Sequence, residues 1–190
     1  MKKLILLGLI TLLCLPVAGY AASMGGVEDQ YFQKGDWEVG FHGSYNNLNV
    51  KVEDESEKIN FLYLDGAVSY FLTNNFSIGV NTIWLYLPEI ENIEAYAIGL
   101  EGNARYHFQM NRHFIPYIGA HVGGFFVNAE VEGKSESENA NSYGFHAGFK
   151  IPINDNVYFD TQLKWTDYKL PWDETDLKTT RVLLGLSIKF

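Results

Sequence analysis

The stretch YAIGLEGNARYHF, residues 96–108, alternates apolar and polar side chains with a period of two. In a β-strand this period places alternate side chains on opposite faces of the sheet. One face of the stretch then runs through apolar, aromatic or small residues from Tyr96 to Phe108, while the other carries Glu101 and Arg105. The stretch therefore predicts a strand with one apolar face and one polar face.

The same alternation recurs in seven further stretches, namely residues 37–45, 62–72, 76–86, 114–126, 143–151, 157–165 and 180–190. On the apolar face of these strands, aromatic residues gather near both ends, with Leu, Val, Ile, Ala and Gly between them. A surface that faces lipid needs such aromatic girdles at the two membrane interfaces. A soluble β-sandwich would also alternate, but it has no need of two girdles.

The connections between these stretches alternate in length. Residues 73–75, 109–113 and 152–156 are short turns, whereas residues 50–60, 88–95, 130–142 and 167–178 are longer and strongly polar. Outer-membrane barrels alternate short periplasmic turns with longer outer loops in this way, and only a closed sheet leaves no unpaired edge in lipid. The predicted fold is all-β, an eight-stranded antiparallel up-and-down transmembrane β-barrel.

The N-terminus has the three parts of a secretory signal. Met1–Lys3 is basic, Leu4–Val17 is apolar and Ala18–Ala21 offers a cleavage site of small residues. A retained anchor would need roughly 20 apolar residues, and this run is shorter and interrupted by Pro16. We expect a signal peptide at 1–21, a short N-terminal periplasmic segment at 22–35 and the barrel at 36–190.

Charge and cysteine content narrow the function further. The chain has 14 basic and 23 acidic residues, and cleavage of the signal would shift its formal charge from −9 to −11. Nucleic-acid binding is not expected, because phosphate contacts need clustered Lys and Arg. The only cysteine, Cys14, lies in the signal, so the mature chain has no disulfide and no thiolate metal site.

The polar face predicts a lumen network of charged and imidazole side chains: Glu38, His42, Asp65, Glu101, Arg105, His121, His146, Lys150, Asp160, Lys164, Arg181 and Lys189. Acids and bases are nearly balanced, which favours ion pairing in a low-dielectric interior. Glu38 and Lys189 should lie near one rim, and Lys150 and Asp160 flank one short turn. A plug of ion pairs and an ion-conducting pathway both remain open. The histidines lack a tight ligand spacing, so we expect no metal and no cofactor.

The last strand ends on an outward aromatic, in the pattern Leu186-x-Ile188-x-Phe190. With the architecture above, the chain resembles the small eight-stranded outer-membrane β-barrel superfamily, which includes the membrane domain of outer-membrane protein A and the opacity-type surface proteins. The resemblance implies that Leu186, Ile188 and Phe190 form an assembly signal read by the barrel assembly machinery. It also implies an integral protein of a Gram-negative-type outer membrane with a periplasmic N-terminus.

Members of that superfamily include anchors, adhesins, channels for small solutes and lipid-modifying enzymes, so the fold leaves several functions open. The pair His42-Gly43-Ser44 is similar to the His-x-Ser pair of lipid A deacylases, in which an imidazole activates a hydroxyl. It departs from that family because it lies in the first strand and points into the lumen.

The leading hypothesis is a structural or surface-interaction protein without catalysis. The second is a narrow porin-like channel for small or apolar solutes, and the third is a lipid-modifying enzyme. Expected partners are outer-membrane lipid and lipopolysaccharide, the assembly machinery, and divalent cations bound by the acidic long connections, which contain Glu53, Glu91, Glu136 and Asp173 among others.

Overall fold

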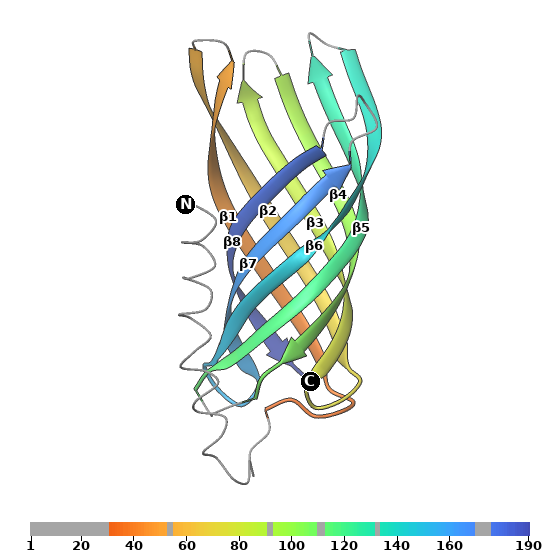
Figure 1. Ribbon diagram of the computed structural model, residues 1–190, viewed down its shortest axis with the longest axis vertical. Coiled ribbons are helices and arrows are strands. Elements are labelled where there is room, and N and C mark those ends of the chain that lie inside the picture. Colours follow the sequence, from red (N-terminus) through yellow and green to blue (C-terminus); the bar gives the residue numbers. More distant parts are fainter. Residues whose placement is uncertain (1–30, 53–54, 91–92, 110–112, 132–133, 170–175) are drawn as a thin grey trace, which may run out of the picture.

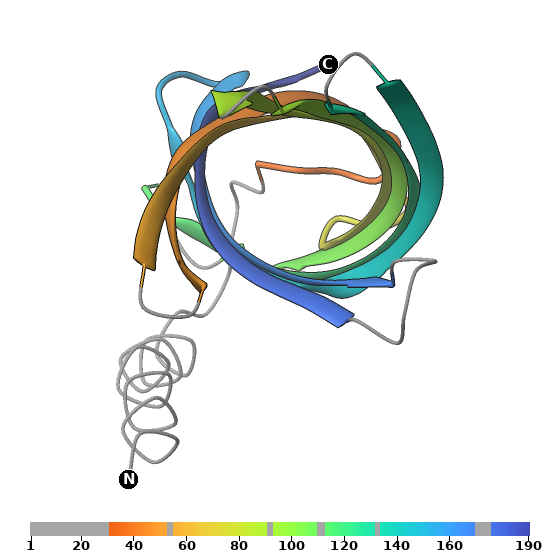
Figure 2. The same cartoon turned by 90° about the horizontal axis from the view of Figure 1, so that it is seen from above.

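The chain forms a closed antiparallel barrel (Figures 1 and 2). The computed structural model describes residues 31–52, 55–90, 93–109, 113–131, 134–169 and 176–190. Its strands are β1 (Trp37–Val52), β2 (Glu55–Phe71), β3 (Phe76–Ile90), β4 (Ile93–His107), β5 (Ile115–Val131), β6 (Lys134–Pro152), β7 (Val157–Lys169) and β8 (Asp176–Lys189). Each strand pairs with the next, and β8 pairs with β1. The predicted fold class is confirmed.

The expected signal peptide lies outside the described residues. Within the described ranges, no helix has the length and apolar character needed to span a bilayer.

The apolar face predicted from the alternation is the outer face of the barrel. On β1, Trp37, Phe41 and Tyr45 are 51%, 59% and 67% exposed, whereas Glu38 and His42 are buried. The other strands follow the same rule, because the pleat sends successive side chains to opposite faces. An exposed surface made of large apolar side chains on every strand suits a lipid environment and would be unfavourable in water.

Four of the predicted connections were assigned wrongly. The stretches expected as long loops largely continue the strands, so that Val52 pairs with Glu55 and Val131 pairs with Lys134. Ladder hydrogen bonds join backbone groups and do not require apolar side chains. A strand that extends beyond lipid loses the alternation of apolar and polar residues, because both of its faces meet water. The strands predicted from the sequence pattern are therefore shorter than the observed strands at this end of the barrel.

The barrel has two distinct ends. At the terminal end lie Trp37, Phe190 and the short turns, and at the hairpin end β1 and β2, β3 and β4, β5 and β6, and β7 and β8 are joined (Figure 1). The seam between β1 and β8 is short: it pairs six residues of β1, Glu38–Gly43, whereas β1 and β2 pair sixteen. Backbone hydrogen bonds between Trp37 and Phe190 extend the seam at the terminal end, with N···O distances of 2.8 and 3.1 Å.

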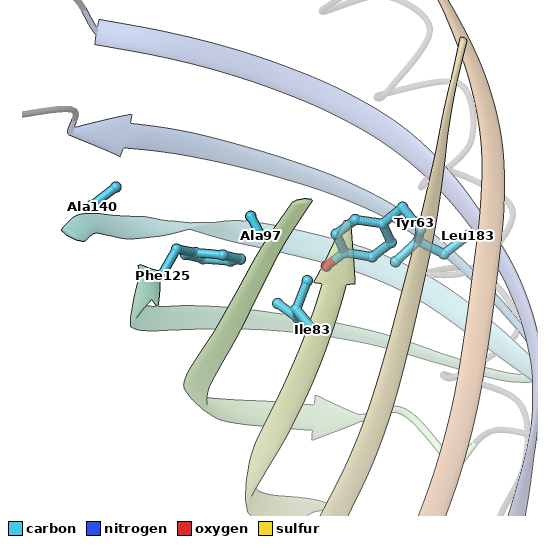
Figure 3. Packing of buried hydrophobic residues seen from close by; sticks show 6 residues of the cluster. All are labelled: Tyr63, Ile83, Ala97, Phe125, Ala140 and Leu183. Atoms are coloured by element: carbon cyan, nitrogen blue, oxygen red, sulfur yellow. The ribbon is translucent and has the colours of Figure 1, made fainter. Parts of the chain in front are cut away.

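Two apolar clusters occupy the lumen. One lies toward the hairpin end and comprises Tyr63, Ile83, Ala97, Phe125, Ala140 and Leu183, from six different strands (Figure 3). The other lies at the terminal end and comprises Phe32, Phe71, Ile115 and Tyr158. Asp65 lies between Tyr63 of the first cluster and Phe71 of the second along β2. Side chains therefore fill the described part of the barrel interior, as expected for eight strands.

A closed sheet of this kind should resist detergent until it is boiled. Because the barrel is closed, each of its strands has a hydrogen-bonded neighbour on both sides. The sheet therefore has no free edge strand at which detergent could enter. We expect the unboiled protein to migrate differently from the boiled protein in a detergent gel, and to fractionate with the outer membrane. Identical migration of the two samples, or recovery in the soluble periplasmic fraction, would contradict the barrel.

Candidate functional site

The strand pleat brings the predicted lumen residues together inside the barrel. Of the twelve, eleven are buried, and Lys189 is 20% exposed at the terminal end. They come from all of the strands except β3. Four acids and four bases are fully enclosed, so the charges of the buried set balance: Glu38, Asp65, Glu101 and Asp160 against Arg105, Lys150, Lys164 and Arg181.

The first group of contacts, the Lys150 cluster, consists of Lys150, Glu38, Asp160 and Arg105. The Lys150 ammonium lies 2.5 Å from Asp160 Oδ2 and 3.0 Å from Glu38 Oε1, and it donates a hydrogen bond to Ser187 Oγ at 3.0 Å. Arg105 Nη1 lies 3.5 Å from the same Glu38 oxygen. Lys150 and Asp160 are direct cross-strand partners, which places the ion pair as the short turn between them suggested.

The second group, the Lys164 cluster, consists of Lys164, Glu101 and Asp65. The Lys164 ammonium lies 2.5 Å from Glu101 Oε2 and 3.5 Å from Asp65 Oδ2, and it donates to the Tyr63 hydroxyl at 3.1 Å. Ser142 donates to the other Glu101 oxygen at 3.2 Å. Each ammonium therefore has two carboxylates and a hydroxyl around it, an arrangement that compensates a buried charge for the loss of water.

His42 connects the two clusters. Its Nε2 lies 3.1 Å from Asp160 Oδ2, and its Nδ1 lies 3.8 Å from Asp65 Oδ1. Both ring nitrogens thus face carboxylates of the network. This environment explains a buried imidazole on structural grounds, and it holds His42 in the ion-pair network between β2 and β7.

His121 and His146 stack against each other in the lumen, with ring centroids 5.7 Å apart and their Nδ1 atoms 3.5 Å apart. His121 Nε2 also lies 3.2 Å from the Thr166 hydroxyl. Two imidazoles alone make a weak metal site, since structural zinc takes four ligands. In the described parts of the chain, no group of three or more His, Cys, Asp or Glu is arranged to hold a metal.

Arg181 and Lys189, two of the predicted lumen bases, do not pair with the acids of these two clusters. Arg181 lies over the rings of Tyr63 and Tyr168, at 4.3 and 5.4 Å, and donates to the Tyr168 hydroxyl. Lys189 is the cross-strand partner of Glu38, but its ammonium donates to the Tyr31 carbonyl at 2.5 Å and lies 3.9 Å from Asp36. Register alone therefore did not determine which charges pair.

The terminal end of the lumen holds a group of aromatic rings that the strand pattern does not predict as a group, the aromatic stopper, formed by Phe32, Phe71, His107 and Tyr158. Phe32 is 0% exposed, and its ring stacks on Phe71 at 4.3 Å and on Tyr158 at 5.1 Å, with His107 at 5.3 Å. The expected periplasmic segment 22–35 thus contributes a side chain to the lumen. One signal was present in the sequence: Phe71 and Tyr158 are aromatic residues at inward positions, where most residues are polar.

Hydrogen bonds fix the segment that carries Phe32. The Phe32 backbone amide donates to Gln109 Oε1, and the Phe32 backbone carbonyl accepts from Gln109 Nε2, both at 3.0 Å. The Lys34 amide donates to Asn74 Oδ1 at 2.9 Å, and the Gly35 amide donates to the Phe71 carbonyl at 2.9 Å. Gly35 has a φ of +100°, a conformation that other residues rarely adopt, so glycine allows the chain to turn from the stopper into β1.

Comparisons with known proteins agree with this architecture. Neisserial surface protein A of Neisseria superposes with a TM-score of 0.60 at 14% identity, covering 83% of this chain and 98% of that chain. Ail, the attachment invasion locus protein of Yersinia pestis, gives 0.57 at 17% identity, covering 83% and 100%. OprG from Pseudomonas aeruginosa gives 0.52 at 13%, covering 85% and 99%. At such identities these similarities concern the fold alone.

A search of curated proteins found no significant match. Residues 7–190 match the family described as "Outer membrane protein beta-barrel domain", which is nearly the whole chain. An apolar outer face, a closed eight-stranded sheet and this match point to the same conclusion. The chain belongs to the family of outer membrane protein β-barrel domains.

Proposed function

We propose that the protein is a closed, non-enzymatic barrel that braces the outer membrane and holds its four extended hairpins at the outer surface. The observation that carries this proposal is the filled lumen, in which Phe32 and the two ion-pair clusters occupy the path along the barrel axis. A protein whose interior is packed offers its outer surface and its hairpins for interaction, and little room for passage.

The proposed orientation places the terminal end in the periplasm and the hairpin end outside the cell. Short turns at the terminal end and long extensions at the hairpin end support it, since outer-membrane barrels have short periplasmic turns. The hairpin extensions would then lie in water beyond the outer leaflet. Divalent cations at their acidic side chains remain part of the proposal, as does the absence of nucleic-acid binding.

A porin-like channel is the main competing function. For ions to cross, the Phe32 ring would have to leave its place against Phe71 and Tyr158, and the buried ion pairs would have to separate. Both changes cost free energy, because they break aromatic contacts and expose or unpair charges. The structure therefore favours the closed barrel over the channel.

Conductance tests this proposal directly. The purified barrel in a planar lipid bilayer should show little or only sporadic conductance, because the stopper and the clusters fill the lumen. Phe32→Ser should increase the frequency of brief openings, since it removes the ring that seals the terminal end. Leu72→Ser is the matched control, because Leu72 lies near the same end but on the outer face, where it is 39% exposed. Large, steady, ion-selective currents from the wild-type protein would overturn the closed barrel and favour the channel.

A further inference from the structure

Two histidines of the lumen, His121 on β5 and His146 on β6, form a pair beside the ion-pair clusters. Their Nδ1 atoms lie 3.5 Å apart, and each side chain is 4% exposed. Two Nδ1 atoms in this position can share one proton, with one ring donating and the other accepting. Two imidazolium rings would instead set two donors and two positive charges against each other, because an imidazolium carries a proton on both nitrogens. The closed pair therefore has no place for a proton on every ring nitrogen.

Each imidazole of the pair fills the space over a glycine of the neighbouring strand. A Cβ atom added to Gly119 would lie 2.3 Å from His146 Nε2, and one added to Gly144 would lie 2.8 Å from His121 Cε1. The rings thus pack directly against the barrel wall, away from water. His146 Nε2 has no hydrogen-bond partner among the described residues, and water that entered an open lumen would supply one.

The charged groups around the pair already balance one another. Three acids and three bases face it, together with the ring of Tyr117 on β5: Asp65 on β2, Glu101 and Arg105 on β4, Asp160 and Lys164 on β7, and Arg181 on β8. Lys164 is the direct cross-strand partner of His146. A proton added to the pair would therefore be an excess positive charge beside an ammonium group, in an interior where charge is costly.

Glu101 is the acid through which the pair meets the Lys164 cluster. Its Oε1 lies 3.9 Å from His121 Nε2 and accepts from Ser142, while its Oε2 lies 2.5 Å from the Lys164 ammonium. A protonated His121 would compete with Lys164 for this one carboxylate, and the cluster would loosen. His42 differs, because its two ring nitrogens face carboxylates at 3.1 and 3.8 Å that compensate a proton.

We propose that His121 and His146 form an acid-sensitive latch, which holds the lumen closed while both rings are neutral and loosens the Lys164 cluster when they are protonated. Protons bind more readily to the open lumen, where water hydrates the imidazolium. The closed form should therefore lose stability as the pH falls below about 6.5, the ordinary pKa of imidazole in water. The latch goes beyond the proposed closed barrel, because it adds a condition under which the interior opens.

Urea-induced unfolding of the full-length mature barrel in one lipid, at about pH 7.5 and about pH 5.5, tests the latch. Each imidazole that is neutral when folded and protonated when unfolded raises the unfolding equilibrium constant about tenfold over this interval, while carboxyl groups stay mostly ionised. We expect His121→Gln together with His146→Gln to reduce the pH dependence of the wild type at least about tenfold. His113→Gln is the matched control, because it removes an exposed histidine near a turn at the terminal end. A double variant that keeps the full pH dependence would overturn the latch.

Conductance in a planar bilayer shows whether protonation opens the lumen. Phe32→Ser removes the ring that seals the terminal end, and its openings should be at least about tenfold more frequent at about pH 5.5 than at about pH 7.5. The double histidine substitution in this background should remove the difference.

His107 is a further buried imidazole, and it packs against Phe32 in the aromatic stopper. His107→Gln in the Phe32→Ser background should therefore keep most of the pH difference if the pair is the latch. Equal opening frequencies at the two pH values, or a difference that persists without the pair, would overturn the latch. Each protein is compared with itself, so steady wild-type currents at about pH 7.5 would contradict the closed barrel, whereas the pH difference alone decides the latch.

Discussion

Replacement of Asp160 by alanine is expected to lower the free energy of unfolding by about 3 to 5 kcal/mol, the usual cost of removing one partner from a buried ion pair. Asp160 is fully buried and faces Lys150, His42 and the Tyr117 hydroxyl, the last at 2.8 Å. Its loss would leave the Lys150 cluster with two cations and one carboxylate. Glu38→Ala should have the same sign but a smaller effect, because Lys150 would keep its shorter contact with Asp160.

Unfolding by urea in one lipid, followed by tryptophan fluorescence, measures these differences. Glu138→Ala is the matched control, since it removes an exposed carboxylate from β6 and should change stability by less than about 0.5 kcal/mol. Asp160→Asn keeps the size and hydrogen-bonding capacity of the side chain and should fall between the wild type and the alanine variant. An alanine variant at position 160 as stable as the wild type would show that the lumen is hydrated and the cluster is not needed to hold it.

Deletion of Phe190 should leave most of the protein uninserted while its synthesis is unchanged. The residue is 72% exposed on the outer face, so no lumen packing is lost with it. What is lost is its backbone pairing with Trp37, which extends the seam, and the aromatic end of the proposed assembly signal. Both losses act on the step in which β8 closes onto β1.

Phe190→Ala separates these two causes, because it keeps the backbone pairing and removes only the ring. If the assembly machinery reads the aromatic side chain, this variant should insert nearly as poorly as the deletion. Phe145→Ala is the matched control, an outer-face phenylalanine 65% exposed on β6 that should insert normally. The inserted fraction is measured from the heat-modifiable band relative to total protein. Normal insertion of both Phe190 variants would contradict the signal.

The sequence predicts the barrel well because lipid outside and a packed interior impose opposite demands on alternate side chains. Trp37, Phe41 and Tyr45 were assigned outward, and Glu38 and His42 inward, from the period alone, and the structure agrees. The hairpin extensions were missed for the same reason. Where water surrounds both faces of a strand, apolar and polar residues no longer alternate along it. The sequence pattern then gives no sign of the strand, although its backbone still pairs with its neighbours.

The partners within the lumen could not be predicted in full. The pair Lys150 and Asp160 follows from one short turn, but the contact of Glu38 with Lys150 joins residues from β1 and β6 across the barrel interior. Such contacts depend on the stagger of all the strands and on side-chain length. The burial of Phe32 was hidden for a different reason, because it precedes the first strand and no period extends to it.

The short seam has a consequence for the order of folding. Seven of the ladders join strands that are neighbours in sequence, so each can form as a local hairpin as soon as its own residues are present. The ladder between β1 and β8 alone joins residues about 150 positions apart, and it is also the ladder with the fewest pairs. Closing so long a loop costs chain entropy, and the few hydrogen bonds of this seam compensate only a small part of that cost. The seven hairpin ladders can therefore persist as an open sheet, and the final closure sets the rate at which the finished barrel appears.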